Sequence, residues 1–323
     1  MRTVCRAFWL SGPGEPAIVE TPLGEPGDGE VVVEARFGAV SRGTETVVAK
    51  GRVPESEYER MRAPLQEGDF PFPVKYGYAT VGRIVGGAPP RDGEEVFVLH
   101  PHQDVFIAPE AMAIPLPKGV APERAVLGAN METALNAVWD AGIQPGDRVA
   151  VIGGGVVGLL TAYLAALIPA SDVTLVDINE VRRGVAERLG LHFAGPDSLP
   201  EDCDVVIHAS ASQDGLASAI LAAGFEARVV ELSWYGERPV TISLGGAFHS
   251  RRLTLVSSQV GEVPQSRRAR WPHARRLAAA LALLADDRLE AIISGETAFS
   301  ALPEAYMGLL ADPDTLCHRI RYD

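Results

Sequence analysis

Three glycines in the segment VAVIGGGVVG, residues 149–158, have the spacing of a turn that binds the diphosphate of a dinucleotide. Gly153 permits a tight turn after an apolar strand, Gly155 lets the backbone approach the diphosphate, and Gly158 lets the next helix pack closely on the sheet. Free N–H groups at the start of that helix favour phosphate oxygens. We therefore expect five residues to bind the cofactor phosphates: Gly153, Gly155, Val156, Val157 and Gly158.

An acidic residue ends the next apolar run. Asp177 closes VTLVD, 19 residues after Gly158. A carboxylate at this place accepts hydrogen bonds from the ribose hydroxyls of adenosine. It would repel a 2′-phosphate, so the sequence favours NAD over NADP even though Arg182 and Arg183 follow on the next predicted helix. A glycine-rich turn in an ordinary α/β domain is the alternative, and the strand, helix and acid together make it the weaker one.

Strand and helix patterns alternate around this turn. The runs DRVAVIG, DVTLVDI, CDVVIHAS and ARVVELSW predict strands, and helical segments separate them. This alternation predicts a parallel sheet with helices on both faces. Ligands bind at the carboxyl ends of such strands, so Ser210, Ser233 and Trp234 are expected beside the cofactor.

The first third of the chain is rich in β patterns. Short β-branched runs bounded by Gly, Pro and Asp cover residues 29–40, 75–86, 93–100 and 103–109. A short exposed helix is expected to begin at Pro54, and a longer helix to end at Gly142. One more helix is predicted within residues 273–287, before a mixed tail of strand and helix.

Length and composition agree with two folded domains. A chain of 323 residues predicts roughly two domains. We expect a β-rich domain from residues 1–122 and 286–323, and a nucleotide-binding domain from residues 123–285. The net charge of −13 argues against a nucleic-acid binder, because neutralising phosphates requires a basic face.

The cysteines and the apolar runs limit which classes of protein remain possible. Cys5, Cys203 and Cys317 lie too far apart for a four-cysteine zinc site or a disulfide framework. The first apolar run is too short for a signal peptide, so we expect a cytoplasmic protein. The uncharged stretch 149–170 is long enough to span a bilayer. Three consecutive glycines near its start favour a buried strand, turn and helix instead, and we expect no membrane contact.

Four segments together resemble the medium-chain dehydrogenase/reductase superfamily, of the zinc alcohol dehydrogenase type. GYATVG (77–82) stands in the place of that family's G-H-E-x-x-G, and GAVSRGTET (38–46) in the place of G-x-C-G-T/S-D/E. PGDRVAVIGGGVVG (145–158) and ANMETALNAV (129–138) resemble two further family segments. The resemblance covers essentially the whole chain. It implies an α/β protein with a GroES-like β-rich catalytic domain, a Rossmann-fold domain with a doubly wound parallel sheet, and an active site in the cleft between them.

The resemblance also implies an activity. It predicts an NAD(P)-dependent oxidoreductase that transfers a hydride between nicotinamide and a small alcohol or carbonyl substrate, and we expect a homodimer. The SRGTE form of the second segment resembles the branch that contains the hydroxyethyl bacteriochlorophyllide dehydrogenase, but five residues do not fix a substrate.

Two zinc ligands of the family are missing from this sequence. Tyr78 stands at the metal-binding His, Ala79 at the adjacent Glu, and either Ser41 or Arg42 at the metal-binding Cys. A phenol and a serine hydroxyl are poor zinc ligands, because zinc prefers thiolate, imidazole or carboxylate. We therefore expect no catalytic zinc. An improvised metal site is the alternative, and its ligands would be His100, His102, Glu45 and Glu132.

Without zinc, hydrogen-bond donors must polarise the substrate oxygen. Thr44 matches the family hydroxyl that begins a proton relay, and Tyr78 could donate its phenol proton. His102 could pass a proton onward near neutral pH, and Glu132 matches an acidic residue that relatives carry near the metal. Each has a plainer alternative. Thr44 could be a capping hydroxyl and Tyr78 a packed corner ring, while His102 could be a solvated loop histidine. Glu132 could be a helix-cap partner.

Two other functions remain open at the level of sequence. Zinc-lacking members of the superfamily reduce the activated C=C bonds of enones or quinones, usually with NADPH, and Asp177 speaks against that cofactor. A nucleotide-binding sensor on a dehydrogenase frame would also keep GGGVVG while losing the metal ligands. The remaining histidines, among them His208, have no predicted partner.

Overall fold

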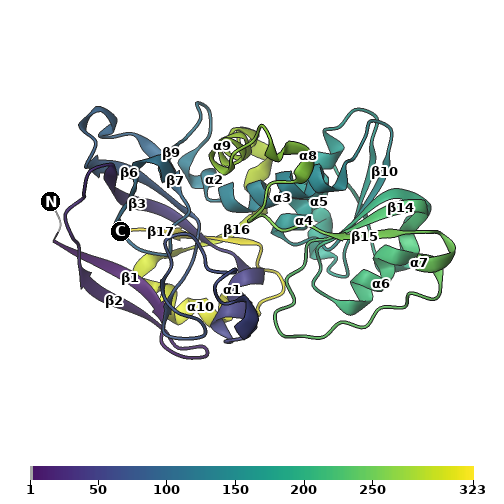
Figure 1. The fold of residues 1–323 in the computed structure, drawn as a ribbon, viewed down its shortest axis with the longest axis horizontal. Helices are drawn as coiled ribbons and strands as arrows, with labels where there is room; N and C mark the ends of the chain where they lie inside the picture. The colour runs from purple at the N-terminus through teal and green to yellow at the C-terminus, as the bar shows by residue number, and fades with distance from the viewer. Residues whose placement is uncertain (1–2) are drawn as a thin grey trace. The chain divides into compact units, whose positions relative to one another are not determined.

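The chain folds into two compact units in a computed structural model, which describes residues 3–323 (Figure 1). The first unit contains the residues up to Ala129 together with 277–287 and 293–323. The second contains 130–276 and 288–292. The chain therefore passes from the first unit into the second twice, for residues 130–276 and for the short segment 288–292, and its last residues belong to the first unit.

The first unit is built on two mainly antiparallel sheets. One has the order β2-β1-β5-β4, and the other the order β16-β17-β3-β6-β7-β9, with β8 also paired to β3. The strands of this unit are β1 Val4–Leu10, β2 Pro16–Pro22, β3 Glu30–Val40, β4 Glu67–Gly68, β5 Val74–Lys75, β6 Thr80–Gly86, β7 Glu95–Val98, β8 Val105–Pro109, β9 Ile114–Pro115, β16 Ile293–Ala298 and β17 Cys317–Arg321. Its helices are α1 Arg42–Ala49, α2 Pro122–Ala125 and α10 Leu302–Ala311.

The strand β3 organises this unit. Its apolar residues Val31 and Val33 are fully buried, as expected for β-branched side chains in the middle of a sheet. The C-terminal strand β17 pairs with it in antiparallel register, with His318 opposite Val40. The mixed tail predicted from the sequence therefore completes the first unit rather than the nucleotide-binding one.

Two predicted helices differ in the structure. The segment after Pro54 forms only a single 3₁₀ turn, Glu55–Glu57, because prolines at 64, 71 and 73 remove the N–H groups that a longer helix needs. The helix predicted before Gly142 is divided into α2 and α3, Gly128–Ala141. Gly142 ends α3 with φ +68°, as predicted.

The second unit is a six-stranded parallel sheet in the order β12-β11-β10-β13-β14-β15, which is the doubly wound order predicted from the alternating pattern. Its strands are β10 Arg148–Ile152, β11 Asp172–Val176, β12 His192–Ala194, β13 Cys203–His208, β14 Ala223–Glu231 and β15 Thr254–Ser257. Its helices are α4 Val156–Ala166, α5 Val181–Leu189, α6 Gln213–Ala222, α7 Ala247–Ser250 and α8 Gln265–Arg268. The helices α3 and α9, His273–Leu283, each have residues in both units.

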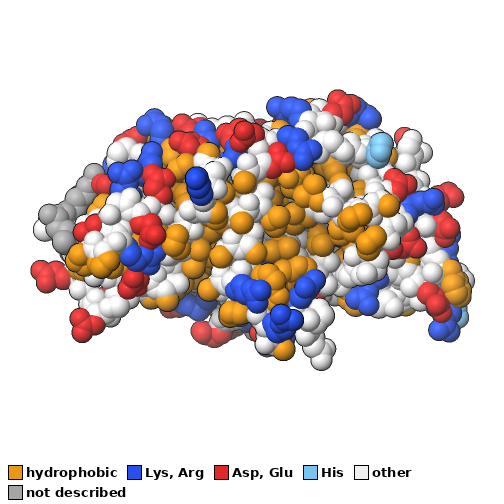
Figure 2. All heavy atoms as spheres, turned by 90° about the horizontal axis from the view of Figure 1, so that it is seen from above, with side chains coloured by type: hydrophobic (Ala, Val, Ile, Leu, Met, Phe, Trp, Pro, Cys, Tyr) orange, Lys and Arg blue, Asp and Glu red, His pale blue; other side chains and the backbone are white. Residues whose placement is uncertain are grey.

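The uncharged stretch 149–170 forms β10, a glycine turn and the eleven-residue helix α4. Within residues 3–323, no helix is long and apolar enough to cross a membrane. On the face drawn in Figure 2, hydrophobic side chains occupy much of the middle, and acidic and basic side chains lie mostly toward the margins. The three cysteines are all buried, and none forms a disulfide within residues 3–323.

Candidate active site

Tyr78 directly follows a corner that only glycine can form. Gly77 has φ +110°, and a Cβ atom there would lie 2.7 Å from the His102 ring. The corner joins β5 to β6 in the first unit, and the half-buried Tyr78 side chain extends from it. Gly77 thus allows Tyr78 and His102 to be close neighbours.

The phenol of Tyr78 lies beside two hydroxyls from the start of α1. Burial raises the pKa of Tyr78, and hydrogen bonds from Ser41 and Thr44 oppose that rise, leaving a pKa of about 12. Arg42 lies elsewhere, because its guanidinium donates to the carbonyl oxygens of Pro313 and Thr315. Ser41, not Arg42, therefore occupies the place that the sequence left ambiguous.

A buried carboxylate lies behind these hydroxyls. Glu45 is 1% exposed and accepts hydrogen bonds from the Ser41 backbone N–H at 2.7 Å and from the Tyr306 hydroxyl at 2.8 Å. The Nε2 atom of His102 lies 3.2 Å from Glu45 Oε2. Sequence reasoning missed Tyr306 altogether, because nothing in its helix distinguishes it from a core aromatic.

Both predicted loop histidines are buried, so the solvated alternative is wrong for them. His102 is fully buried, and its Nδ1 atom has no hydrogen-bond partner among residues 3–323. The His100 ring stacks on Phe106 with centroids 3.7 Å apart. Burial lowers the pKa of His100 to about 3, and the nearby Lys75 ammonium adds to this effect. His100 is therefore neutral at physiological pH.

These side chains do not fit a zinc site. Tyr78, Ser41 and Thr44 offer a phenol and two hydroxyls, which zinc disfavours. Glu45 is already held by a tyrosine hydroxyl and a backbone N–H. In the described part of the chain, no three His, Cys, Asp or Glu residues are grouped so that they could hold a metal ion.

Glu132 belongs to the second unit and is paired there with Arg276. The Nε atom of Arg276 donates to Glu132 Oε1 at 3.0 Å, and both side chains are almost fully buried. Arg276 also donates to Asn136 and to the Val260 carbonyl oxygen. Burial raises the pKa of Glu132, and Arg276 opposes that rise. This pair joins the first turn of α9 to α3.

The glycine turn of the second unit fits a dinucleotide. A Cβ atom at Gly153, which has φ +113°, would lie 2.7 Å from the Ser210 backbone nitrogen, and one at Gly158 would collide with the Gly153 carbonyl oxygen. A Cβ atom at Gly155 would meet no atom within 4 Å, so open space lies over the start of α4. Val156 and Val157 begin that helix, where free N–H groups favour phosphate.

Asp177 lies at the end of β11, against this turn. Its carboxylate accepts hydrogen bonds from the backbone N–H groups of Gly154 and Asn179. A carboxylate has further lone pairs, so it can still accept from ribose hydroxyls. Arg183 pairs with Glu180 and stacks on Phe193, 4.5 Å from the ring centroid.

Ser210 and Ser233 follow β13 and β14, as predicted, and they join a polar network. His208 Nε2 lies 2.7 Å from Ser210 Oγ, and His208 Nδ1 lies 2.7 Å from Glu231 Oε2. Ser233 Oγ accepts from the Ala211 backbone N–H at 3.0 Å. No partner of His208 could be predicted from the sequence, since Glu231 is brought beside it only by strand pairing.

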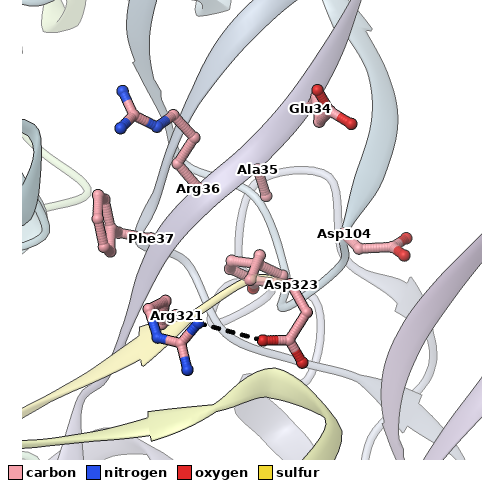
Figure 3. Close-up of a pocket in the computed structure, with 8 residues that line it drawn as sticks. Glu34, Ala35, Arg36, Phe37, Asp104, Arg321 and Asp323 are labelled. Carbon is pink, nitrogen blue, oxygen red and sulfur yellow. Dashed lines mark hydrogen bonds and ion pairs between the residues drawn. The ribbon is translucent and has the colours of Figure 1, made fainter.

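A separate hollow of about 410 Å³ lies in the first unit, near the C-terminus (Figure 3). Its lining includes Arg36, Asp104 and Arg321, and Arg321 is paired with Asp323. None of the predicted catalytic residues lines it.

Known proteins with similar sequences cover nearly the whole chain. The D-guloside 3-dehydrogenase of Escherichia coli (strain K12) is 26% identical over 309 residues, which cover 86% of this chain and 88% of the relative. The 2-desacetyl-2-hydroxyethyl bacteriochlorophyllide A dehydrogenase of Cereibacter sphaeroides is 24% identical, with 98% and 97% covered. No protein-family model matches the chain.

Solved structures have the same fold. Acetophenone reductase from Geotrichum candidum, in complex with NAD, has a TM-score of 0.80 at 16% identity, covering 99% of this chain and 98% of that one. In sequence and in fold the chain is similar to zinc-type medium-chain alcohol dehydrogenases. This confirms the resemblance and the expected GroES-like and Rossmann-fold architecture. Other solved structures with this superfamily fold contain NADH or NADP, so the fold alone does not select the cofactor.

Proposed function

We propose that this protein is an NAD-dependent oxidoreductase that interconverts an alcohol and a carbonyl compound without catalytic zinc, using Tyr78 as the proton donor. The chain is an NAD(P)-dependent oxidoreductase of the alcohol dehydrogenase type, as its relatives indicate. The choice of NAD and the absence of zinc from catalysis are the parts that we add.

The observation that carries this proposal is the position of the Tyr78 phenol beside the Ser41 and Thr44 hydroxyls. These residues stand where zinc-type relatives have the metal-binding His, the metal-binding Cys and the relay hydroxyl. A phenol with a pKa of about 12 is protonated at neutral pH, so it can donate a hydrogen bond to a carbonyl oxygen. As negative charge develops on that oxygen, the phenol O–H bond breaks and the proton forms the alcohol O–H bond. The tyrosinate is held by the two hydroxyls until water returns a proton.

The residues that hold the cofactor would be those of the glycine turn together with Asp177, Ser210 and Ser233. The nicotinamide ring supplies or accepts the hydride when the cofactor is bound. Asp177 supports NAD, because a 2′-phosphate would be placed against a carboxylate. The pairing of Arg183 with Glu180 makes that arginine a weaker candidate for binding the phosphate.

Label transfer tests this proposal. NADH carrying tritium at C4 of the nicotinamide, incubated with a panel of aldehydes and ketones, should transfer the label to one face of at least one carbonyl. Protein that binds NADH tightly but transfers no label to any member of the panel would favour the sensor instead. Transfer only to enones, with NADPH preferred, would favour the C=C reductase.

A further inference from the structure

The network at the ends of β13 and β14 contains a buried histidine that the proposed reaction does not use. His208 is fully buried between Ser210 on one ring nitrogen and Glu231 on the other, each at 2.7 Å. Glu231 also accepts from the Ser233 backbone N–H at 2.7 Å and from the Tyr235 hydroxyl at 3.1 Å. The side chains of Tyr235, Glu231, His208 and Ser210 are thus joined in one hydrogen-bonded chain, in which His208 is fully buried.

The direction of each hydrogen bond follows from the charge on Glu231. Burial alone would raise the pKa of Glu231, but hydrogen bonds from His208 and Ser233 bring the pKa below its ordinary value. An ionised carboxylate only accepts, so His208 Nδ1–H donates to it. In the neutral imidazole, Nε2 then accepts, and Ser210 must donate its only proton to it. The Ser210 oxygen therefore only accepts from its other neighbours, of which the Ser212 backbone N–H lies 3.3 Å away.

The position of Ser210 indicates which part of a dinucleotide it would contact. The turn after β10 is flanked by β11 on one side and β13 on the other. A Cβ atom at Gly154 would approach the Asp177 carboxylate, and one at Gly153 would approach the Ser210 backbone. With the diphosphate over the turn and the adenosine ribose on Asp177, the other half of the cofactor extends toward Ser210.

We propose that Ser210, oriented by the buried His208–Glu231 pair, accepts a hydrogen bond from a hydroxyl of the nicotinamide ribose. His208 and Glu231 are then positioning residues for the cofactor. An oxygen that only accepts cannot donate to a phosphate, but it suits a ribose hydroxyl. The exposed Ser212 hydroxyl, 3.0 Å from Ser210 Oγ, marks the place that the ribose hydroxyl would take.

Three ligands separate this role from simple packing. ADP contains only the adenosine half, whereas ADP-ribose and NAD contain the second ribose. Calorimetric titration of Ser210→Ala should show ADP-ribose and NAD binding about threefold to tenfold more weakly, the effect of one neutral hydrogen bond, with ADP binding unchanged. Ser218→Ala, a serine on α6 that donates to the Asp214 carbonyl oxygen, is the matched control.

Glu231→Gln tests the orientation of the hydrogen bonds. Its amide would donate to His208 Nδ1, reverse the imidazole tautomer and turn the Ser210 proton outward. It should weaken the binding of ADP-ribose and NAD less than Ser210→Ala does, because a ribose hydroxyl can also accept from the outward Ser210 hydroxyl. The double variant should bind no more weakly than Ser210→Ala alone. The inference would be overturned if the affinity for ADP fell as much as the affinity for ADP-ribose. It would also be overturned if neither variant lowered the affinity for ADP-ribose. The inference rests on the dinucleotide site of the proposed function, so wild-type protein that binds none of the three ligands would overturn both.

Discussion

The Nε2 atom of His102 lies 3.2 Å from Oε2 of Glu45, and both side chains are buried in the first unit. This contact joins the loop between β7 and β8 to α1, the helix whose start carries Ser41 and Thr44. Because Gly77 crosses directly over the His102 ring, the same contact also supports the corner that presents Tyr78. Glu45 and His102 therefore act on catalysis, in our proposal, by positioning Tyr78 and its two hydroxyl partners.

Removing the Tyr78 hydroxyl should impair the reaction but not the fold. Tyr78→Phe should lower turnover by about 10² to 10³, the effect of losing one preorganised donor to a developing oxyanion. Thr44→Val should act in the same direction. Turnover and melting temperature should be measured on one sample, with Tyr58→Phe as the control. A lower melting temperature with unchanged turnover per folded molecule would show that Tyr78 only packs the corner.

The cofactor preference should depend on Asp177. NAD(H) should bind at least about tenfold more tightly than NADP(H), or about 1.4 kcal/mol, and Asp177→Asn should reduce that ratio. Calorimetric titration of both cofactors measures it, with the exposed Asp197→Asn as the control. Equal affinities in the wild-type protein would contradict the role of Asp177.

Purified protein should contain much less than one zinc ion per chain, because Tyr78 and Ser41 replace two zinc-binding residue types. A chelator should leave turnover and melting temperature unchanged. Tyr78→His brings back the metal-binding residue type of the family. It should not recover the turnover that is lost in Tyr78→Phe, since the second ligand position is a serine. Elemental analysis that finds one tightly held zinc ion per chain would refute this prediction.

The ion pair between Arg276 and Glu132 should be important for stability. Arg276→Met should lower the free energy of unfolding by about 3 to 5 kcal/mol, because it leaves Glu132 buried without its partner. Arg276→Met combined with Glu132→Leu should cost less than the sum of the two single changes. Urea unfolding measures this, with the exposed Arg183→Met as the control. If Glu132→Gln lowers turnover without changing stability, Glu132 has the catalytic role suggested by the sequence.

The neutral His100 should make the protein sensitive to acid. Its pKa is about 3 in the folded state and about 6.5 in an unfolded chain, so protons favour unfolding. Its contribution to stability is complete above pH 6.5 and is lost as the pH falls toward 3. His100→Asn keeps a donor for the Pro101 carbonyl oxygen and should flatten the stability profile over that range. The exposed His192→Asn should leave the profile as steep as in the wild type.

The alternating pattern of the second unit predicted its sheet well, because each strand and helix is a continuous local segment. The spacing of Gly153, Gly155 and Gly158 likewise predicted the turn, since one short segment contains all three. The helix after Pro54 was wrong, because several prolines acted together over a longer stretch than the start signal alone suggested.

The polar clusters were harder to predict, because their members are distant in sequence. Tyr306 reaches Glu45 across 261 positions, and His208 meets Glu231 only through the pairing of β13 with β14. No local pattern records such contacts. The sequence alone likewise could not decide between Ser41 and Arg42. The backbone decides it, because it directs Ser41 toward Tyr78 and Arg42 toward the loop before β17.

The burial of all three cysteines offers a route to labelling the molecule. Cys5, Cys203 and Cys317 are each no more than 2% exposed, and burial raises the pKa of Cys203 to about 11. Thiols of this kind react slowly, because the thiolate is the reactive form. A cysteine introduced on the surface of each unit should therefore take a maleimide dye selectively, in otherwise native protein. Energy transfer between two such dyes would follow the distance between the units while cofactor is added.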